Sequence, residues 1–170
     1  TVGIGLEVLD GTTVDIDTLK LDRVNVGLLT SDSVAVDIEK IIVQGDVGVC
    51  LDLTDSAGID VASIESTAGI LTRVIRGSGV AQLDVGEISA TGATDGAWGI
   101  ELDIVGNTSI GGGSLSGYSY GVSIRGSGSA DLGELNISAD EMSVSASGSG
   151  DLTAMSGNWS NAATIASISS

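Results

Sequence analysis

The chain has 170 residues, enough for one domain with a sizeable core, and 42% of them are hydrophobic, which excludes an intrinsically disordered chain. Phe, Pro and His are absent and aromatic residues make up only 2%, so aliphatic side chains must fill the interior, which favours a narrow, repetitive core. The 23 acidic and 6 basic residues give a net charge of −17, which excludes a nucleic-acid partner and attraction to an anionic membrane surface.

An eight-residue pattern that begins Val14-Asp-Ile-Asp recurs along the chain. Its seven copies begin at Val14, Val36, Ile59, Leu83, Ile110, Ala130 and Gly150, in steps of 22, 23, 24, 27, 20 and 20 residues. A second short strand precedes each copy. These strands begin at Ile4, Val26, Val49, Arg73, Ile100, Val122 and Met142. Turn residues separate the strands, namely Asp10-Gly11, Ser31-Asp32, Ser56 to Gly58 and the Gly-Ser-Gly runs at 77–79, 126–128 and 148–150.

Apolar and polar residues alternate within each copy, which is typical of strands, although 14–22 also contains good helix formers. A period near 22 residues with two or three short strands per period is typical of a parallel β-helix. The sequence therefore predicts one all-β domain over 1–170, a parallel β-solenoid of about seven rungs with 20–27 residues each. The variable step length favours a right-handed coil.

Equivalent residues of successive rungs lie on top of one another in a solenoid, so a column of carboxylates is predicted on the outside. Its members are Asp15, Asp37, Asp60, Asp84, Asp131 and Asp151, with Gly111 in the fifth rung. Like charges about 5 Å apart repel by roughly 1 kcal/mol in water. Two hypotheses remain open: a solvated edge where the carboxylates cap backbone N–H groups, or a ladder that binds Ca²⁺ as the only expected cofactor.

The preceding strand carries a second outward row of alternating charge. Its predicted members in consecutive rungs are Asp52, Arg76, Asp103 and Arg125. Opposite charges in adjacent rungs would neutralise each other without a metal ion, so structural pairing is expected, and a ligand site at the arginines is the alternative.

The few aromatic residues lie close together in the sequence. Trp98-Gly-Ile100 and Tyr120-Gly-Val122 are predicted in the same register of adjacent rungs, with Tyr118 nearby and Thr91 to Ala97 as an extra loop. Such a pair could bind a sugar ring, or it could form a corner stack or a subunit contact.

Three sequons, at Asn107, Asn136 and Asn158, favour a glycosylated and exported protein. Asn136 is predicted to point outward within a strand, which makes it the weaker acceptor. The single cysteine, Cys50, excludes an internal disulfide. No apolar stretch is long enough to insert into a membrane.

The stretch from Val122 to Gly157 contains Ile-Arg-Gly-Ser-Gly-Ser-Ala-Asp-Leu and, later, Ser-Ala-Ser-Gly-Ser-Gly-Asp-Leu. It resembles the rungs of the head GIN domain, an auto-transporter adhesin family of bacterial surface β-helices. The resemblance covers about a fifth of the chain and is absent from the first three rungs. It implies a surface location and adhesion or scaffolding, and it implies no catalytic residues.

The absence of His excludes catalytic triads and histidine metal sites, and short rungs offer few loops for a cleft, so an enzyme is not expected. Both ends of the repeat look uncapped, and open sheet ends pair with further strands, so the rod either belongs to a longer chain or stacks head to tail. We therefore predict an extracellular structural protein, a subunit of a cell-surface filament that forms a homo-oligomer by head-to-tail stacking. The alternatives are a surface adhesin or glycan-binding module, and a segment of a viral tail fibre, which would trimerise.

Overall fold

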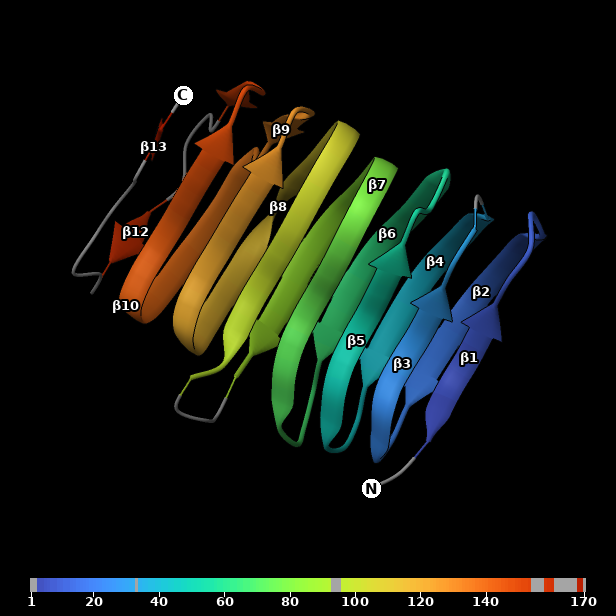
Figure 1. Ribbon diagram of the computed structural model, residues 1–170. Coiled ribbons are helices and arrows are strands. Elements are labelled where there is room, and N and C mark those ends of the chain that lie inside the picture. The colour runs from blue at the N-terminus through green and yellow to red at the C-terminus, as the bar shows by residue number, and fades with distance from the viewer. Residues whose placement is uncertain (1–2, 33, 93–95, 154–157, 161–167, 170) are drawn as a thin grey trace.

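The computed structural model describes residues 3–32, 34–92, 96–153, 158–160 and 168–169, and every regular element among them is a β-strand. The strands are β1 (Ile4–Val8), β2 (Thr13–Leu21), β3 (Val24–Thr30), β4 (Ala35–Val43), β5 (Val47–Thr54), β6 (Gly58–Ser66), β7 (Leu71–Thr91), β8 (Trp98–Gly126), β9 (Ser129–Asp131), β10 (Glu134–Gly148), β11 (Leu152–Thr153), β12 (Trp159–Ser160) and β13 (Ile168–Ser169). They belong to one 13-stranded sheet that coils into a rod (Figure 1).

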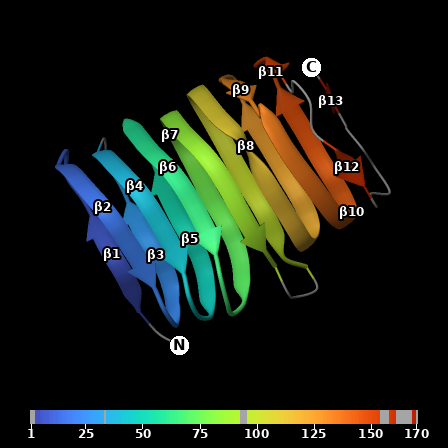
Figure 2. The same ribbon diagram turned by 180° about the vertical axis from the view of Figure 1, so that it is seen from behind.

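Every pairing between different strands is parallel. Strands β1, β3 and β5 lie side by side and continue into β7, and β2, β4 and β6 do the same on the other face, which is seen from behind in Figure 2. The chain is therefore a β-solenoid of about six turns, here called rungs, which confirms the predicted fold class. The seventh predicted copy of the repeat falls partly on residues 154–157, outside the described residues.

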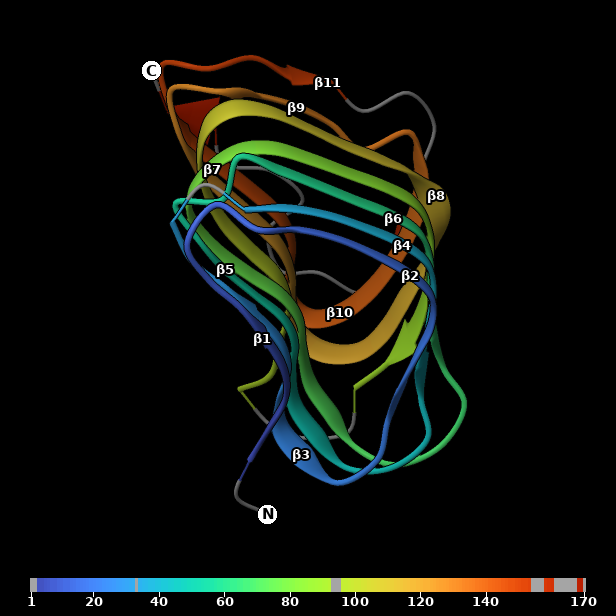
Figure 3. The same ribbon diagram turned by 90° about the vertical axis from the view of Figure 1, so that its right-hand side faces the viewer.

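The solenoid is right-handed, as the variable step length predicted. Seen from the end that carries β1, the chain passes from β1 over to β2 and down to β3 in a clockwise direction while it recedes (Figure 3). A right-twisted strand that crosses over to a parallel neighbour takes this hand in nearly all known folds.

The core is a narrow aliphatic column inside the coil. Val36, Ile38, Ile41 and Val43 of β4 are buried, and their neighbours Val61 and Ile64 in the next rung are buried as well. Ile38 and Ile41 are both buried although they are three residues apart, so the regular alternation of inward and outward side chains is broken between them. Such a break indicates a corner within the strand. No large ring is needed in this column, with the exception of Tyr118, the largest fully buried side chain.

The actual period is more regular than the predicted one. Register partners of Val14 are Val36, Ile59, Leu83, Thr108, Ala130 and Leu152, in steps of 22, 23, 24, 25, 22 and 22 residues. The predicted start of the fifth copy at Ile110 is wrong by two positions, since Ile110 pairs with Val85. The longest step does fall where it was predicted, next to the connection of β7 with β8 over 92–97.

Glycines form a second column at one corner of the coil. The Gly106, Gly128 and Gly150 backbones lie so close that a Cβ on any of them would overlap the carbonyl oxygen of the preceding rung. The Gly-Ser-Gly runs at 126–128 and 148–150 therefore stack as turns whose backbones approach each other too closely for side chains between them. Gly126 and Gly148 have positive φ angles of 110° and 124°, which only glycine adopts readily.

Candidate functional site

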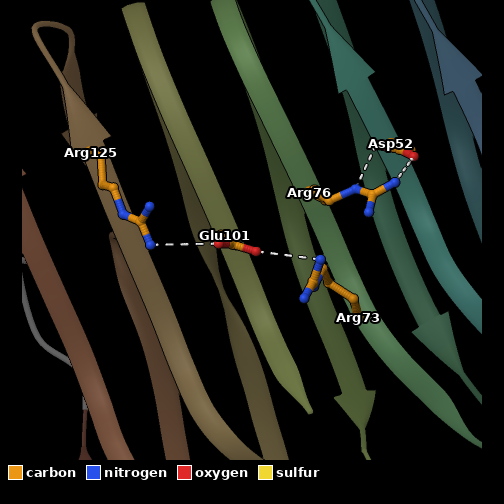
Figure 4. Close-up of polar contacts among 5 residues, drawn as sticks. All are labelled: Asp52, Arg73, Arg76, Glu101 and Arg125. Carbon is orange, nitrogen blue, oxygen red and sulfur yellow. Dashed lines mark hydrogen bonds and ion pairs between the residues drawn. The ribbon is translucent and has the colours of Figure 1, made fainter. Parts of the chain in front are cut away.

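The most structured group of polar side chains lies on the outside of β5, β7 and β8. We call it the arginine strip, and it comprises Asp52, Arg73, Arg76, Glu101 and Arg125. It holds half of the six basic residues of a chain with a net charge of −17. Figure 4 shows Arg73 and Arg125 approaching Glu101 from opposite sides, while Arg76 points away toward Asp52.

The contacts of the strip cross from rung to rung. Arg76 donates to both carboxylate oxygens of Asp52, with 2.9 Å between Nε and Oδ1. Nη1 of Arg73 lies 3.3 Å from Oε2 of Glu101, and Nη2 of Arg125 lies 3.6 Å from Oε1 of the same carboxylate. The hydrogen bonds that Arg76 donates to Asp52 raise the pKa of Arg76. Each ion pair thus links two neighbouring rungs and resists their separation.

The predicted row of alternating charge is right at Asp52 and Arg76 but wrong at the third member. Arg76 is opposite Glu101, and Asp103 is opposite Ser78. Arg125, whose register partner in the following rung is Ser147, pairs with Glu101 and not with Asp103. The structural role predicted for the row is therefore carried by a carboxylate two positions earlier, and Arg73 joins it unpredicted.

The aspartate column exists for four rungs. Asp15, Asp37, Asp60 and Asp84 are register partners in succession. The next position is Ser109 and not Gly111, followed by Asp131, and the last is Thr153 and not Asp151. Both corrections are shifts by two residues.

The contacts of the column favour the solvated alternative over the metal ladder. Asp84 accepts a hydrogen bond from Nε2 of Gln82 at 2.7 Å, and Asp131 accepts one from the backbone N–H of Gly133 at 3.0 Å. Among the described residues no three acidic, cysteine or histidine side chains converge into a possible metal site. Binding of Ca²⁺ by this column stays a prediction.

Repulsion within the column is concentrated at Asp60. Burial raises the pKa of Asp60, and the flanking carboxylates of Asp37 and Asp84 raise it further. Because the folded protein then holds this proton more tightly than the unfolded chain, the group destabilises the fold at neutral pH, and this penalty is lost as the pH falls through the raised pKa.

We expect Asp60→Asn to stabilise the protein at pH 7 by less than about 1 kcal/mol, because the column is exposed and well screened. The gain should vanish below pH 3.8, the ordinary pKa of the group. Denaturant unfolding of both proteins between pH 3 and 7 measures it, with Asp17→Asn, which lies outside the column, as the control. An equal gain at every pH would contradict the repulsion.

The aromatic pair forms as predicted. The rings of Trp98 and Tyr120 stack with 4.3 Å between centroids and 21° between planes. In the register, Arg73 is the partner of Trp98 and Met142 is the partner of Tyr120. The Tyr120 hydroxyl donates to Glu141 at 2.5 Å, a bond that raises the pKa of Tyr120. Sugar binding and a corner stack or subunit contact both stay predictions for this pair.

Tyr118 does not belong to that surface. Its side chain is 0% exposed and packs in the core, where its ring lies against the backbone of Gly92. Burial raises the pKa of Tyr118, and the nearby Cys50 thiol adds to the shift, so the phenol stays neutral. Its predicted part in glycan binding is excluded by this position.

The Tyr118 hydroxyl has no hydrogen-bond partner among the described residues. A buried hydroxyl without a partner costs free energy, so Tyr118→Phe should leave the free energy of unfolding unchanged or raise it by about 1 kcal/mol. Chemical denaturation of the two proteins measures the difference. A loss of more than about 1 kcal/mol would show that the hydroxyl is bonded in solution.

The three sequons differ in their surroundings. The Asn136 side chain lies on the outside of β10, where Nδ2 donates to the Gly113 carbonyl at 3.2 Å and Oδ1 accepts from the backbone of Asn158. A glycan at Asn136 would replace one of the two Nδ2 hydrogens, which donate to the Gly113 and Glu134 carbonyls, in line with its prediction as the weaker acceptor. Asn107 and Asn158 are exposed.

Cys50 is the side chain with the greatest intrinsic nucleophilicity in the chain, but the fold buries it. It is completely buried, and burial raises the pKa of its thiol to about 12. The thiol is therefore protonated at neutral pH and inaccessible to a substrate.

Comparison of the chain with protein-family models, curated proteins and solved structures finds no match. The resemblance of 122–157 to head GIN domains accordingly stays a prediction from its turn residues. The described residues contain no helix long and apolar enough to cross a membrane.

Proposed function

We propose that this protein is a non-enzymatic, extracellular structural protein, a subunit of a surface filament or fibre whose solenoids stack head to tail. The proposal is supported by the surface of the first rung. Val14, Ile16 and Leu19 of β2 are partly exposed, whereas their register partners Val36, Ile38 and Ile41 are buried.

The outer side of the same rung adds to this apolar surface. Ile4 is 45% exposed and Leu9 is 40% exposed, so two of the four exposed large hydrophobic side chains of the described residues lie in this rung. Among the described strands, β1 pairs only with β3 and β2 only with β4, which leaves the other edge of each for further pairing. A further rung paired here would bury the apolar side chains of the first rung and would also form hydrogen bonds with the unpaired backbone groups of β1 and β2.

A second copy is the occupant that we propose for this edge. The rows that begin at Val14 and Ile16 continue with aliphatic partners through β4, β6 and β7, so a rung of a second molecule with the same rows can continue the column. Such a contact joins different surfaces of the two copies and does not close into a ring, which generates a filament. The extracellular location is supported by the sequons at Asn107 and Asn158.

Electron microscopy and sedimentation of the purified chain over a range of concentrations and salt test the proposal. The wild type should form rods that lengthen with concentration. Ile16→Asp, which places a charge in the joint, should remain short, and Val105→Asp, at a 59% exposed position on the flank, should behave as the wild type. Circular dichroism establishes that both variants are folded. Uniform short particles of the wild type under every condition would refute it, and a discrete trimer would favour the tail-fibre alternative.

A further inference from the structure

A hollow lies on the flank of the rod beside the arginine strip. We call it the charged hollow. It has a volume of about 380 Å³, and Asp52, Arg76, Ser78, Glu101, Asp103 and Arg125 are among its lining residues. Strands β5, β7 and β8 contribute to it, so it spans several rungs of a rigid scaffold. Its volume is within the range of small-molecule sites.

Some of its polar groups are fixed and others are available. The Asp52 carboxylate is 11% exposed and holds Arg76 through two hydrogen bonds, which sets the position of this guanidinium. Arg125, with its side chain 56% exposed, reaches Glu101 only at 3.6 Å. Asp103 is exposed and has no ion pair or hydrogen bond among the described residues.

An available donor and an available acceptor line the same hollow, namely Arg125 and Asp103, and no ion pair joins the two. Oδ1 of Asp103 faces the backbone of the adjacent rung, since a Cβ added at Gly126, the residue after Arg125, would lie 2.8 Å from it. The hollow thus offers a guanidinium that can donate and a carboxylate that can accept, and Thr54 and Ser78 are also among its lining residues.

The charge of the hollow selects among ligands. Its three carboxylates, at Asp52, Glu101 and Asp103, are matched by the guanidinium groups of Arg76 and Arg125 and by Arg73, which pairs with Glu101. An anion would be repelled by the rest of a surface with net charge −17, and a cation would find carboxylates over the whole rod. What distinguishes this place is the density of donors and acceptors together, which suits a neutral ligand whose hydroxyls both donate and accept.

We propose that the charged hollow binds a neutral, hydroxyl-rich ligand, a sugar unit of a neutral polysaccharide. Arg125 donates to one hydroxyl and Asp103 accepts from its neighbour, while Arg76 is held by Asp52 as a fixed wall. Recognition relies on these hydrogen bonds and not on stacking, because none of the described residues that line the hollow is aromatic. The site does not depend on filament formation.

Binding of soluble neutral polysaccharides, a glucan, a mannan and a galactan, to the immobilised chain tests the proposal, with a polyuronate as the charged comparison. At least one neutral polymer should bind, and its affinity should stay nearly constant between about 0.05 and 0.5 M salt, because no net charge is exchanged. Arg125→Gln and Asp103→Asn should each weaken it about tenfold, the loss expected for one charge-assisted hydrogen bond.

Lys40→Gln is the matched control, since it removes an exposed cation with one ion pair, to Glu65, from another face of the rod. It should bind as the wild type, and circular dichroism should be the same for all variants. Absence of binding to every neutral polymer, unchanged binding in both hollow variants, or preference for the polyuronate with a steep loss in salt would each overturn the proposal.

Discussion

Replacing Gly106 by alanine should destabilise the protein by about 3 kcal/mol, because the new methyl group has no space. Its Cβ would overlap the carbonyl oxygen of Ala81 in the preceding rung. That atom belongs to the backbone, so relief requires the two rungs to move apart. Gly106 also lies at an irregularity of the pairing, where Val80 and Gln82 face Ile104 and Asn107, so the rung has one extra residue to accommodate.

Gly58→Ala is the matched control for this prediction. A Cβ at Gly58 has no heavy atom within 4 Å, and its φ is not in the left-handed region. Its register neighbour Ala35 already carries a side chain. We expect a gain of about 0.5 kcal/mol, because alanine restricts the unfolded chain. Denaturant midpoints of the two variants measure the contrast, and equal midpoints would show that the rungs separate without cost.

The fold could be predicted from the sequence because inward positions repeat with an aliphatic side chain. Val14, Val36 and Ile59 are register partners in the structure as predicted, and so are the first four aspartates. The errors begin in the fifth rung and are all shifts by two positions. A strand shifted by two keeps every side chain on its own face, so alternation alone does not distinguish the two registers.

The loss of register has a local cause. The pairing is irregular at Val80 to Gln82, where the offset between the rungs changes from 25 to 24 residues and back, and Gly111 to Gly113 leave no side chain by which to align the fifth rung. The more uniform steps of 25, 22 and 22 residues would have favoured the observed register over 27, 20 and 20.

The candidate site was predicted only in part for the same reason. The sequence pointed to Asp52, Arg76 and Arg125 on one face, but Glu101 becomes visible as their partner only in the correct register. The burial of Tyr118 was missed because aromatic residues were expected outside a narrow core. The close approach of its ring to Gly92 shows that a glycine makes the space for it.

Shortening an inward-facing isoleucine should lower the free energy of unfolding more in the second rung than in the first. Ile38 is 0% exposed, so Ile38→Ala should lower the free energy of unfolding by about 3.5 kcal/mol through lost burial and an unfilled cavity. Its register partner Ile16 is only half-buried, so in the unassembled protein Ile16→Ala should cost about half as much, because its side chain remains partly in water.

Assembly should remove this difference. If a second copy covers the first rung, Ile16 acquires the surroundings that Ile38 has within one molecule, and its truncation should then cost as much. Melting of the two variants at low concentration and in assembled rods measures both values, and Val105→Ala, on the exposed flank, should change neither. Equal costs for Ile16→Ala and Ile38→Ala at low concentration would mean that the first rung is already covered in solution. A persistent difference in the rods would mean that they join through another surface.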